Sequence, residues 1–236
     1  MKEMESQYFS RPTLLLVAIV SIIISLRNRK KFKILDWFPI YLISFLVAFL
    51  ANDMLYVLSL RPFFIPCSQY ADYIFTLLEL LVFSNLYYRI INNQSVKNTI
   101  LITNMVFFAY FIYMAVLDVD FPNGISELTQ SNVYTVEAVL LLLMCLTYFF
   151  QVFRSLPYSD IKNEPIFWIS AGLLFFVTCT LPHSLLENYI FKNYHSYSFS
   201  LYAIFYIFYI LLFLMIIRAY SCKPKERYSN DVKKSF

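Results

Sequence analysis

Four carboxylate side chains lie inside stretches of sequence that are otherwise apolar enough to cross a membrane. They are Asp53, Asp72, Glu79 and Glu137, and no lysine or arginine stands beside them in the sequence. A charged acid in hydrocarbon costs about 2.5–3.5 kcal/mol even on the most lenient insertion scales. Each acid must therefore be neutral, hydrogen-bonded to a polar partner, or facing water or a ligand. These acids are the first indication of a binding site.

Polar and aromatic side chains recur at helical spacing in the same stretches, which places them on single faces of the predicted helices. These stripes are Ser44, Ala48 and Asn52; Gln69, Asp72, Thr76 and Glu79; Tyr134, Glu137, Tyr148 and Gln151; Gly172, Cys179, His183 and Glu187; and Phe199, Tyr202, Tyr206, Tyr209 and Phe213. Lipid offers polar groups no hydrogen-bond partners, so helices packed in a bilayer turn such stripes inward.

The depth of each group follows from a helical rise of about 1.5 Å per residue. Asp53, Asp72, Glu137 and His183 come out roughly 6–10 Å below the outer boundary, and Glu79 about 20 Å below it. This predicts an outward-opening polar vestibule with Asp72 at its rim and Glu79 deeper. The candidate ligand-binding residues are Glu79, Glu137, Asp72, His183, Tyr134 and Tyr206.

A proline inside the sixth stretch adds to this prediction. Pro182 leaves the carbonyl group of Thr178, four residues earlier, without its helical hydrogen bond and should kink the backbone. We therefore expect an irregular wall on that side of the vestibule.

A purely structural role for the acids carries equal weight at this point. Buried acids in membrane bundles often accept hydrogen bonds from tyrosine, threonine or asparagine on a neighbouring helix. The chain has 20 tyrosines. If a tyrosine hydroxyl donates a hydrogen bond to each of Glu79 and Glu137, the role of these acids is to hold neighbouring helices together. Asp53 lies close enough to the interface to be solvated.

The amino-acid composition is unlike that of most soluble proteins. The chain has 236 residues, of which 60% are hydrophobic and only 14% are charged, whereas soluble domains carry about 25% charged residues. Two glycines cannot build a glycine-rich phosphate loop, so we expect no nucleotide cofactor. The four cysteines lack CxxC spacing, so neither a metal site nor a disulfide framework is indicated. Basic residues at helix ends explain the net charge of +4 without nucleic acid.

The hydropathy pattern predicts an all-α bundle of seven transmembrane helices in one domain. The spans are 8–26, 37–58, 66–88, 96–117, 131–153, 165–187 and 196–219, followed by a basic tail over 221–236. With the amino terminus outside, the cytoplasmic ends hold fifteen of the 19 lysines and arginines, and the outer side holds Lys2, Arg11, Arg61 and Lys192. This asymmetry predicts a cytoplasmic carboxyl terminus and a multi-pass protein of the cell (inner) membrane.

Several known functions of seven-helix proteins require residues or features that this chain lacks. A retinal pigment needs a lysine inside the seventh helix, and 196–217 contains none. A ceramidase-type zinc hydrolase needs several histidines, whereas this chain has only His183 and His195. The broken, glycine-interrupted helices of many transporters are not indicated, and no channel filter is evident.

Three segments carry a resemblance to a known family. They are YADYIFTLLELLVFSNLYYR (70–89), VYTVEAVLLLLMCLTYFFQVF (133–153) and EPIFWISAGLLFFVTCTLPH (164–183). They resemble a family of uncharacterised seven-helix bacterial membrane proteins of the type associated with sensor kinases. The resemblance matches Glu79 and Glu137 to family glutamates, and Trp168 and Gly172 to the start of its sixth helix. The family's histidine in the seventh helix is absent here.

The sequence therefore predicts a membrane protein with a sensory or receptor-like role and no catalytic residue. Its vestibule would bind a small cationic ligand, a metal ion or a proton, and a cytoplasmic partner such as a sensor kinase would respond. Two alternatives stay open. One is a membrane-embedded lipid-modifying hydrolase that uses paired carboxylates as general acid and base. The other is a structural or accessory membrane subunit.

Overall fold

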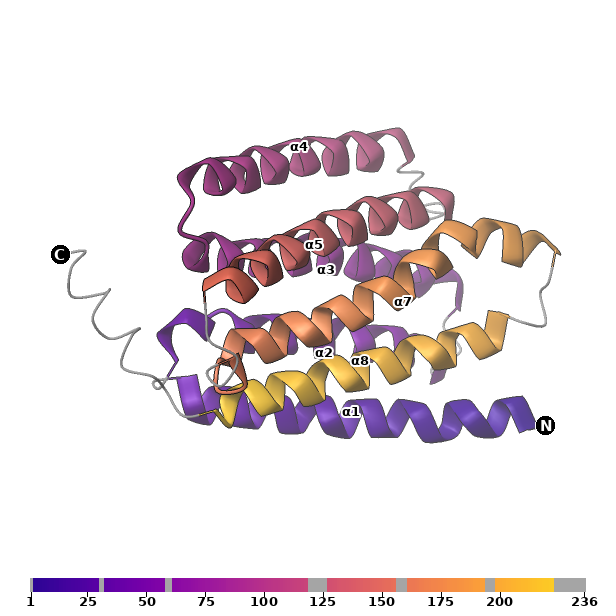
Figure 1. Cartoon of the computed structure of the whole chain (residues 1–236). Helices are drawn as coiled ribbons and strands as arrows, with labels where there is room; N and C mark the ends of the chain where they lie inside the picture. The colour runs from indigo at the N-terminus through magenta and orange to yellow at the C-terminus, as the bar shows by residue number, and fades with distance from the viewer. Residues whose placement is uncertain are drawn as a thin grey trace.

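The computed structural model shows seven long helices among the described residues, which confirms the predicted all-α class (Figure 1). These are α1 (Lys2–Asn28), α2 (Phe38–Val57), α3 (Arg61–Ile90), α4 (Gln94–Asp118), α5 (Glu127–Ser155), α7 (Pro165–Asn193) and α8 (Ser198–Tyr220), with a short 3₁₀ helix η2 (Lys33–Leu35). The structure describes residues 2–29, 32–57, 61–118, 127–155, 161–193 and 198–222. Side chains are described for 11–29, 32, 34–51, 70–116, 131–154, 161–185 and 205–222. Most of the predicted basic tail lies outside these residues.

Local sequence sets several helix boundaries. The Asn93 side chain accepts a hydrogen bond of 3.0 Å from the Ser95 amide and so caps the start of α4. Helix α7 begins at Pro165, where a missing amide hydrogen costs nothing because no helical carbonyl would accept it. The helix continues through Pro182 to Asn193 as one element, so the predicted kink does not end it.

Six of the seven helices form a closed ring. In order around the ring, α1 packs on α2, α2 on α3, α3 on α5, α5 on α7, α7 on α8, and α8 on α1. Helix α4 lies outside this ring and packs against α3 and α5 (Figure 1). Its buried residues Ile100, Phe107 and Phe111 form a single narrow stripe. The remaining faces of α4 expose large apolar side chains such as Met105 and Val116.

The outer surface of the bundle has the apolar character of a surface that faces lipid. Four segments are long and apolar enough to cross a membrane: Arg11–Asn28, Gln94–Val116, Ser131–Arg154 and Pro165–Leu185. Shorter apolar segments occur in α2 (Phe38–Ala51) and α8 (Phe205–Tyr220). Helix α3 is not among these candidates, and it carries the buried polar groups Thr76, Glu79 and Ser84. The structure thus supports a multi-pass membrane protein with at least four candidate spans among the described residues.

Arginines mark one end of the bundle. They stand in the last turn of α1, α3, α5 and α8, as Arg27, Arg89, Arg154 and Arg218, whereas the last turns of α2 and α4 contain no base. Successive helices alternate in direction, so these four last turns lie at the same end (Figure 1). The first helix begins at the opposite end (Figure 1).

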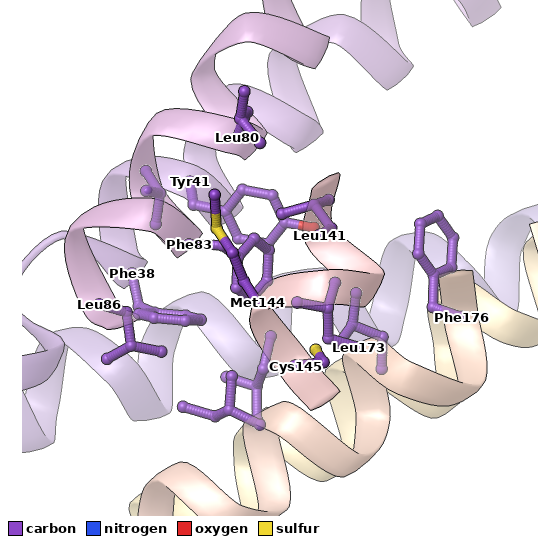
Figure 2. Packing of buried hydrophobic residues seen from close by; sticks show 14 of the residues in the cluster. Phe38, Tyr41, Leu80, Phe83, Leu86, Leu141, Met144, Cys145, Leu173 and Phe176 are labelled. Carbon is purple, nitrogen blue, oxygen red and sulfur yellow. The ribbon is translucent and has the colours of Figure 1, made fainter. Parts of the chain in front are cut away.

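The half of the bundle nearest the arginines is a solid core. Phe38 and Tyr41 of α2 pack edge-on against Phe83 of α3, at ring-centroid distances of 5.5 and 5.4 Å (Figure 2). The Tyr87 hydroxyl donates a 3.0 Å hydrogen bond to Ser170 Oγ and lies 3.0 Å from Cys145 Sγ. Helices α3, α5 and α7 are therefore joined by both apolar and polar contacts in this region.

Helices α7 and α8 approach each other closely at Gly172. A side chain there would place its Cβ 2.8 Å from Cβ of Met215 and 3.2 Å from Cδ1 of Leu212. A glycine allows this approach because it has no Cβ, as is usual where membrane helices meet through small residues. Gly172 therefore serves packing between two walls of the ring.

Candidate binding cavity

A cavity of about 450 Å³ lies inside the ring. All six ring helices contribute to its lining, and no described side chain of α4 does. The structure brings together all the candidate ligand-binding residues predicted from the sequence: Glu79, Glu137, Asp72, His183, Tyr134 and Tyr206. Its volume falls within the range of about 300–1,000 Å³ typical of small-molecule sites.

Glu79 lies at the side of the cavity nearest the solid core. Its side chain is only 4% exposed, and its Oε1 accepts a 2.9 Å hydrogen bond from the hydroxyl of Tyr41. The Tyr41 ring stacks on Phe75, which is itself part of the cavity lining. A rigid aromatic support therefore holds Glu79 in position.

Glu137 differs from Glu79 in its hydrogen bonding. Its side chain is 6% exposed, and among the described residues its Oε1 has no hydrogen-bond partner. The two carboxylates lie close enough for their charges to interact. Among the described side chains a tyrosine hydroxyl bonds to Glu79, whereas Glu137 Oε1 has no such donor, so the purely structural explanation fits Glu79 better than Glu137.

Tyr209 connects the acids with the wall formed by α8. It lies within electrostatic range of Asp72, Glu79, Tyr134 and Glu137. Its ring packs on Phe176 of α7 at a centroid distance of 4.4 Å. The sequence placed Tyr209 on an aromatic stripe, and the structure places it beside the acids.

At the end of the cavity farthest from the solid core, a hydrogen bond and a ring contact join neighbouring helices. Ser131 Oγ of α5 donates a 2.6 Å hydrogen bond to the backbone carbonyl of Ser184 of α7. The His183 ring meets Phe205 of α8 edge-on, at a centroid distance of 4.4 Å. These contacts fix α7 between its neighbours α5 and α8, and so position His183.

The structure also adds a base that the sequence analysis assigned to membrane topology. Arg11 of α1 is half-buried and lines the cavity, and its Cζ lies 5.9 Å from the ring centroid of Tyr206. Among the described residues, no ion pair joins its guanidinium to Glu79 or Glu137. The cavity therefore contains both acids and a base.

Other members of the predicted stripes lie away from the cavity. Tyr148 is buried beside Tyr87 in the solid core, with ring centroids 5.9 Å apart. Phe213 packs against Phe45 with ring centroids 4.8 Å apart, and it does not line the cavity. Gln151, Gly172, Cys179 and Ser44 also do not line the cavity. A helical stripe runs the length of its helix, whereas the cavity occupies only half of the bundle.

Some predicted positions lie outside the described side chains. They are Asn52, Asp53, Gln69, Glu187, His195, Phe199 and Tyr202. Among the side chains that the structure describes, no group of three or more His, Cys, Asp or Glu residues could hold a metal ion.

Comparison with known proteins identifies no relative. No protein-family model, curated protein or solved structure matches the chain. The resemblance to sensor-kinase-associated membrane proteins therefore remains an interpretation of the sequence, and the function must be argued from the cavity.

Proposed function

We propose that this chain is a multi-pass membrane protein with a receptor-like role that binds a small organic cation in its central cavity. The observation that carries the proposal is the buried Oε1 of Glu137, which has no hydrogen-bond partner among the described residues. A buried polar atom without a partner costs about 1–3 kcal/mol, and more when it is charged. A bound cation would offset that cost.

The aromatic walls favour an organic cation. Phe45, Phe75, Phe176, Tyr206 and Tyr209 line the cavity around the two glutamates. An ammonium group is attracted to the faces of aromatic rings, and this attraction strengthens when water is excluded. The acids would neutralise the ligand's charge, while the rings would pack against its carbon atoms.

The proposed topology has seven membrane spans with the amino terminus outside. Two considerations support it: the helices run side by side in one bundle, and arginines gather in four last turns at one end (Figure 1). Basic residues favour the cytoplasmic side of a membrane. The cavity would then lie in the outer half of the bilayer.

Helix α8 offers a physical connection from the cavity to the arginine-rich end. Tyr209 lies at the cavity, and at the far end of the same helix the Tyr220 hydroxyl donates a 3.1 Å hydrogen bond to the Leu35 carbonyl. Cζ of Arg218 lies 5.4 Å from the ring centroid of Trp168 of α7. A ligand that shifts α8 would alter these contacts, where a cytoplasmic partner such as a sensor kinase would respond.

The test is ligand-induced stabilisation of the purified full-length chain in detergent, with pentylamine and choline as probes. A ligand at 100 times its dissociation constant stabilises the folded state by about 2.7 kcal/mol. We expect a rise in Tm for the wild type with at least one probe. Glu137→Gln should abolish that rise because it removes the negative charge.

Glu164→Gln provides the matched control, because Glu164 is a half-buried acid just before α7 and outside the cavity. This variant should respond to the probe as the wild type does. Equal responses of Glu137→Gln and the wild type would show that the cation does not bind at this acid. The absence of any response in the wild type would also contradict the proposal.

A second candidate function rests on the unequal surroundings of the two glutamates. Glu79 accepts a hydrogen bond from Tyr41, whereas Glu137 Oε1 has no such partner among the described residues. Unequal environments are how paired carboxylates divide the roles of general acid and general base. Turnover of purified lipids by the wild type, lost in both Glu79→Gln and Glu137→Gln, would support a lipid hydrolase over a receptor.

A further inference from the structure

Arg11 introduces a positive charge into a cavity whose other charged groups are acids. It stands at the beginning of the apolar segment Arg11–Asn28 of α1, and its guanidinium lies over the Tyr206 ring. Membrane topology alone does not explain why Arg11 lines the cavity, because an arginine that only marks the membrane boundary has no need to face the interior of the bundle. A ligand for this cavity must therefore be compatible with a fixed positive charge.

Arg11 and Glu137 stand on opposite walls of the cavity. Helix α1 packs between α2 and α8, whereas α5 packs between α3 and α7, so α1 and α5 occupy opposite positions of the six-helix ring. Arg11 and Glu137 both line the cavity, and no ion pair joins them among the described residues. Opposite charges held apart across one cavity suit a ligand that carries both signs.

The neighbours of the two charges on α8 are offset along that helix. Arg11 stacks on Tyr206, while Tyr209, which is in electrostatic range of Glu79 and Glu137, lies three residues further along α8. Three residues correspond to about 4.5 Å of rise. Because Arg11 and Glu137 stand on opposite walls of the ring, the complementary charges of a ligand that reaches both must be several bonds apart.

We infer that the cavity binds a small zwitterion whose ammonium group faces Glu137 and Glu79 and whose anionic group faces Arg11. This inference rests on the proposed cation site and narrows its ligand class. The separated charges fit an ω-amino acid or a phosphoethanolamine group, and the aromatic walls fit the methylene groups between the charges. An arginine suits the anionic end because its planar guanidinium forms paired hydrogen bonds with carboxylate and phosphate.

The experiment compares three probes of equal chain length on the full-length protein in detergent: 5-aminopentanoate, pentylamine and pentanoate. Dissociation constants are obtained from the concentration dependence of Tm. We expect 5-aminopentanoate to bind at least about tenfold more tightly than pentylamine, as one charge-assisted hydrogen bond predicts. Pentanoate should bind most weakly. Pentylamine binding as tightly as 5-aminopentanoate would overturn the inference and leave the cation site intact.

Variants of Arg11 separate the two halves of the site. Arg11→Gln should remove the advantage of 5-aminopentanoate over pentylamine while pentylamine still binds, and Arg11→Lys should restore part of that advantage. Glu137→Gln should weaken both probes. If Arg11→Gln keeps the full advantage, the zwitterion inference fails; if Glu137→Gln leaves both probes unaffected, the proposed function itself fails. The wild-type comparison requires no variant and remains decisive if Arg11→Gln does not fold.

The same chemistry occurs in soluble compounds and in lipid head groups. A second set of measurements therefore compares O-phosphoethanolamine with lyso-phosphatidylethanolamine at equal concentration. Stabilisation that is lost in Arg11→Gln supports the inference, and the compound with the larger effect identifies a soluble or a lipid source. Equal stabilisation of the wild type and Arg11→Gln by both compounds would overturn it.

Discussion

Replacing Gly172 by alanine tests the packing that holds two walls of the ring together. The added Cβ would stand 2.8 Å from Met215 Cβ, an atom attached directly to the α8 backbone. The helices must separate to relieve this contact. Overpacking of this kind costs about 1–3 kcal/mol, whereas alanine's better helix propensity returns about 0.8–1 kcal/mol. Because backbone movement along the α7–α8 contact is required, we expect a net loss of about 1–2 kcal/mol in the free energy of unfolding.

The assay is unfolding of the purified protein in mixed micelles of increasing SDS fraction, followed by tryptophan fluorescence. Trp168 stands near the start of α7 and lies over Arg218 of α8, so it should report separation of these helices. Thr178→Ala is the control, because Thr178 is on the exposed face of α7 and bonds only to its own helix. If Gly172→Ala is as stable as the wild type, the close approach of α7 and α8 is refuted.

Three further predictions concern the support of Glu79, the reactivity of the Cys222 thiol and the orientation of the chain. Tyr41→Phe should lower the free energy of unfolding by about 1.5–3 kcal/mol, because it removes a hydrogen bond to a buried carboxylate; an SDS titration that shows no loss would contradict that contact. Burial raises the pKa of the Cys222 thiol, so its maleimide labelling should accelerate as pH rises above the ordinary thiol range. A membrane-impermeant maleimide should reach Cys222 only after cells are permeabilised. Labelling in intact cells that disappears in Cys222→Ser would contradict a cytoplasmic carboxyl terminus.

The sequence predicted those features that depend on the periodicity of one helix. Asp72, Thr76 and Glu79 share a face of α3, and all three line the cavity. Tyr134 and Glu137 likewise reach it from α5. In each case the residue spacing alone defines the face, and the absence of polar partners in lipid indicates that the face turns inward.

The sequence did not predict features that depend on which helices are neighbours. Tyr41 supports Glu79 only because α2 packs on α3, and Arg11 enters the cavity only because α1 closes the ring between α2 and α8. Nothing in the spacing within one helix encodes these pairings. The end of the cavity was also unpredictable, since it depends on how large side chains such as Phe83 and Tyr87 fill the space between helices.

The position of α4 outside the ring determines how the two glutamates face the cavity. Helix α4 returns the chain along the bundle, so α3 and α5 become neighbours that run parallel, whereas directly connected helices would be antiparallel (Figure 1). In any α-helix the Cα–Cβ bonds tilt toward the amino-terminal end. Glu79 and Glu137 therefore lean toward the same end of the molecule, away from the terminal arginines Arg89 and Arg154 of their own helices. Helix α4, none of whose described side chains lines the cavity, thereby gives both acids a common direction.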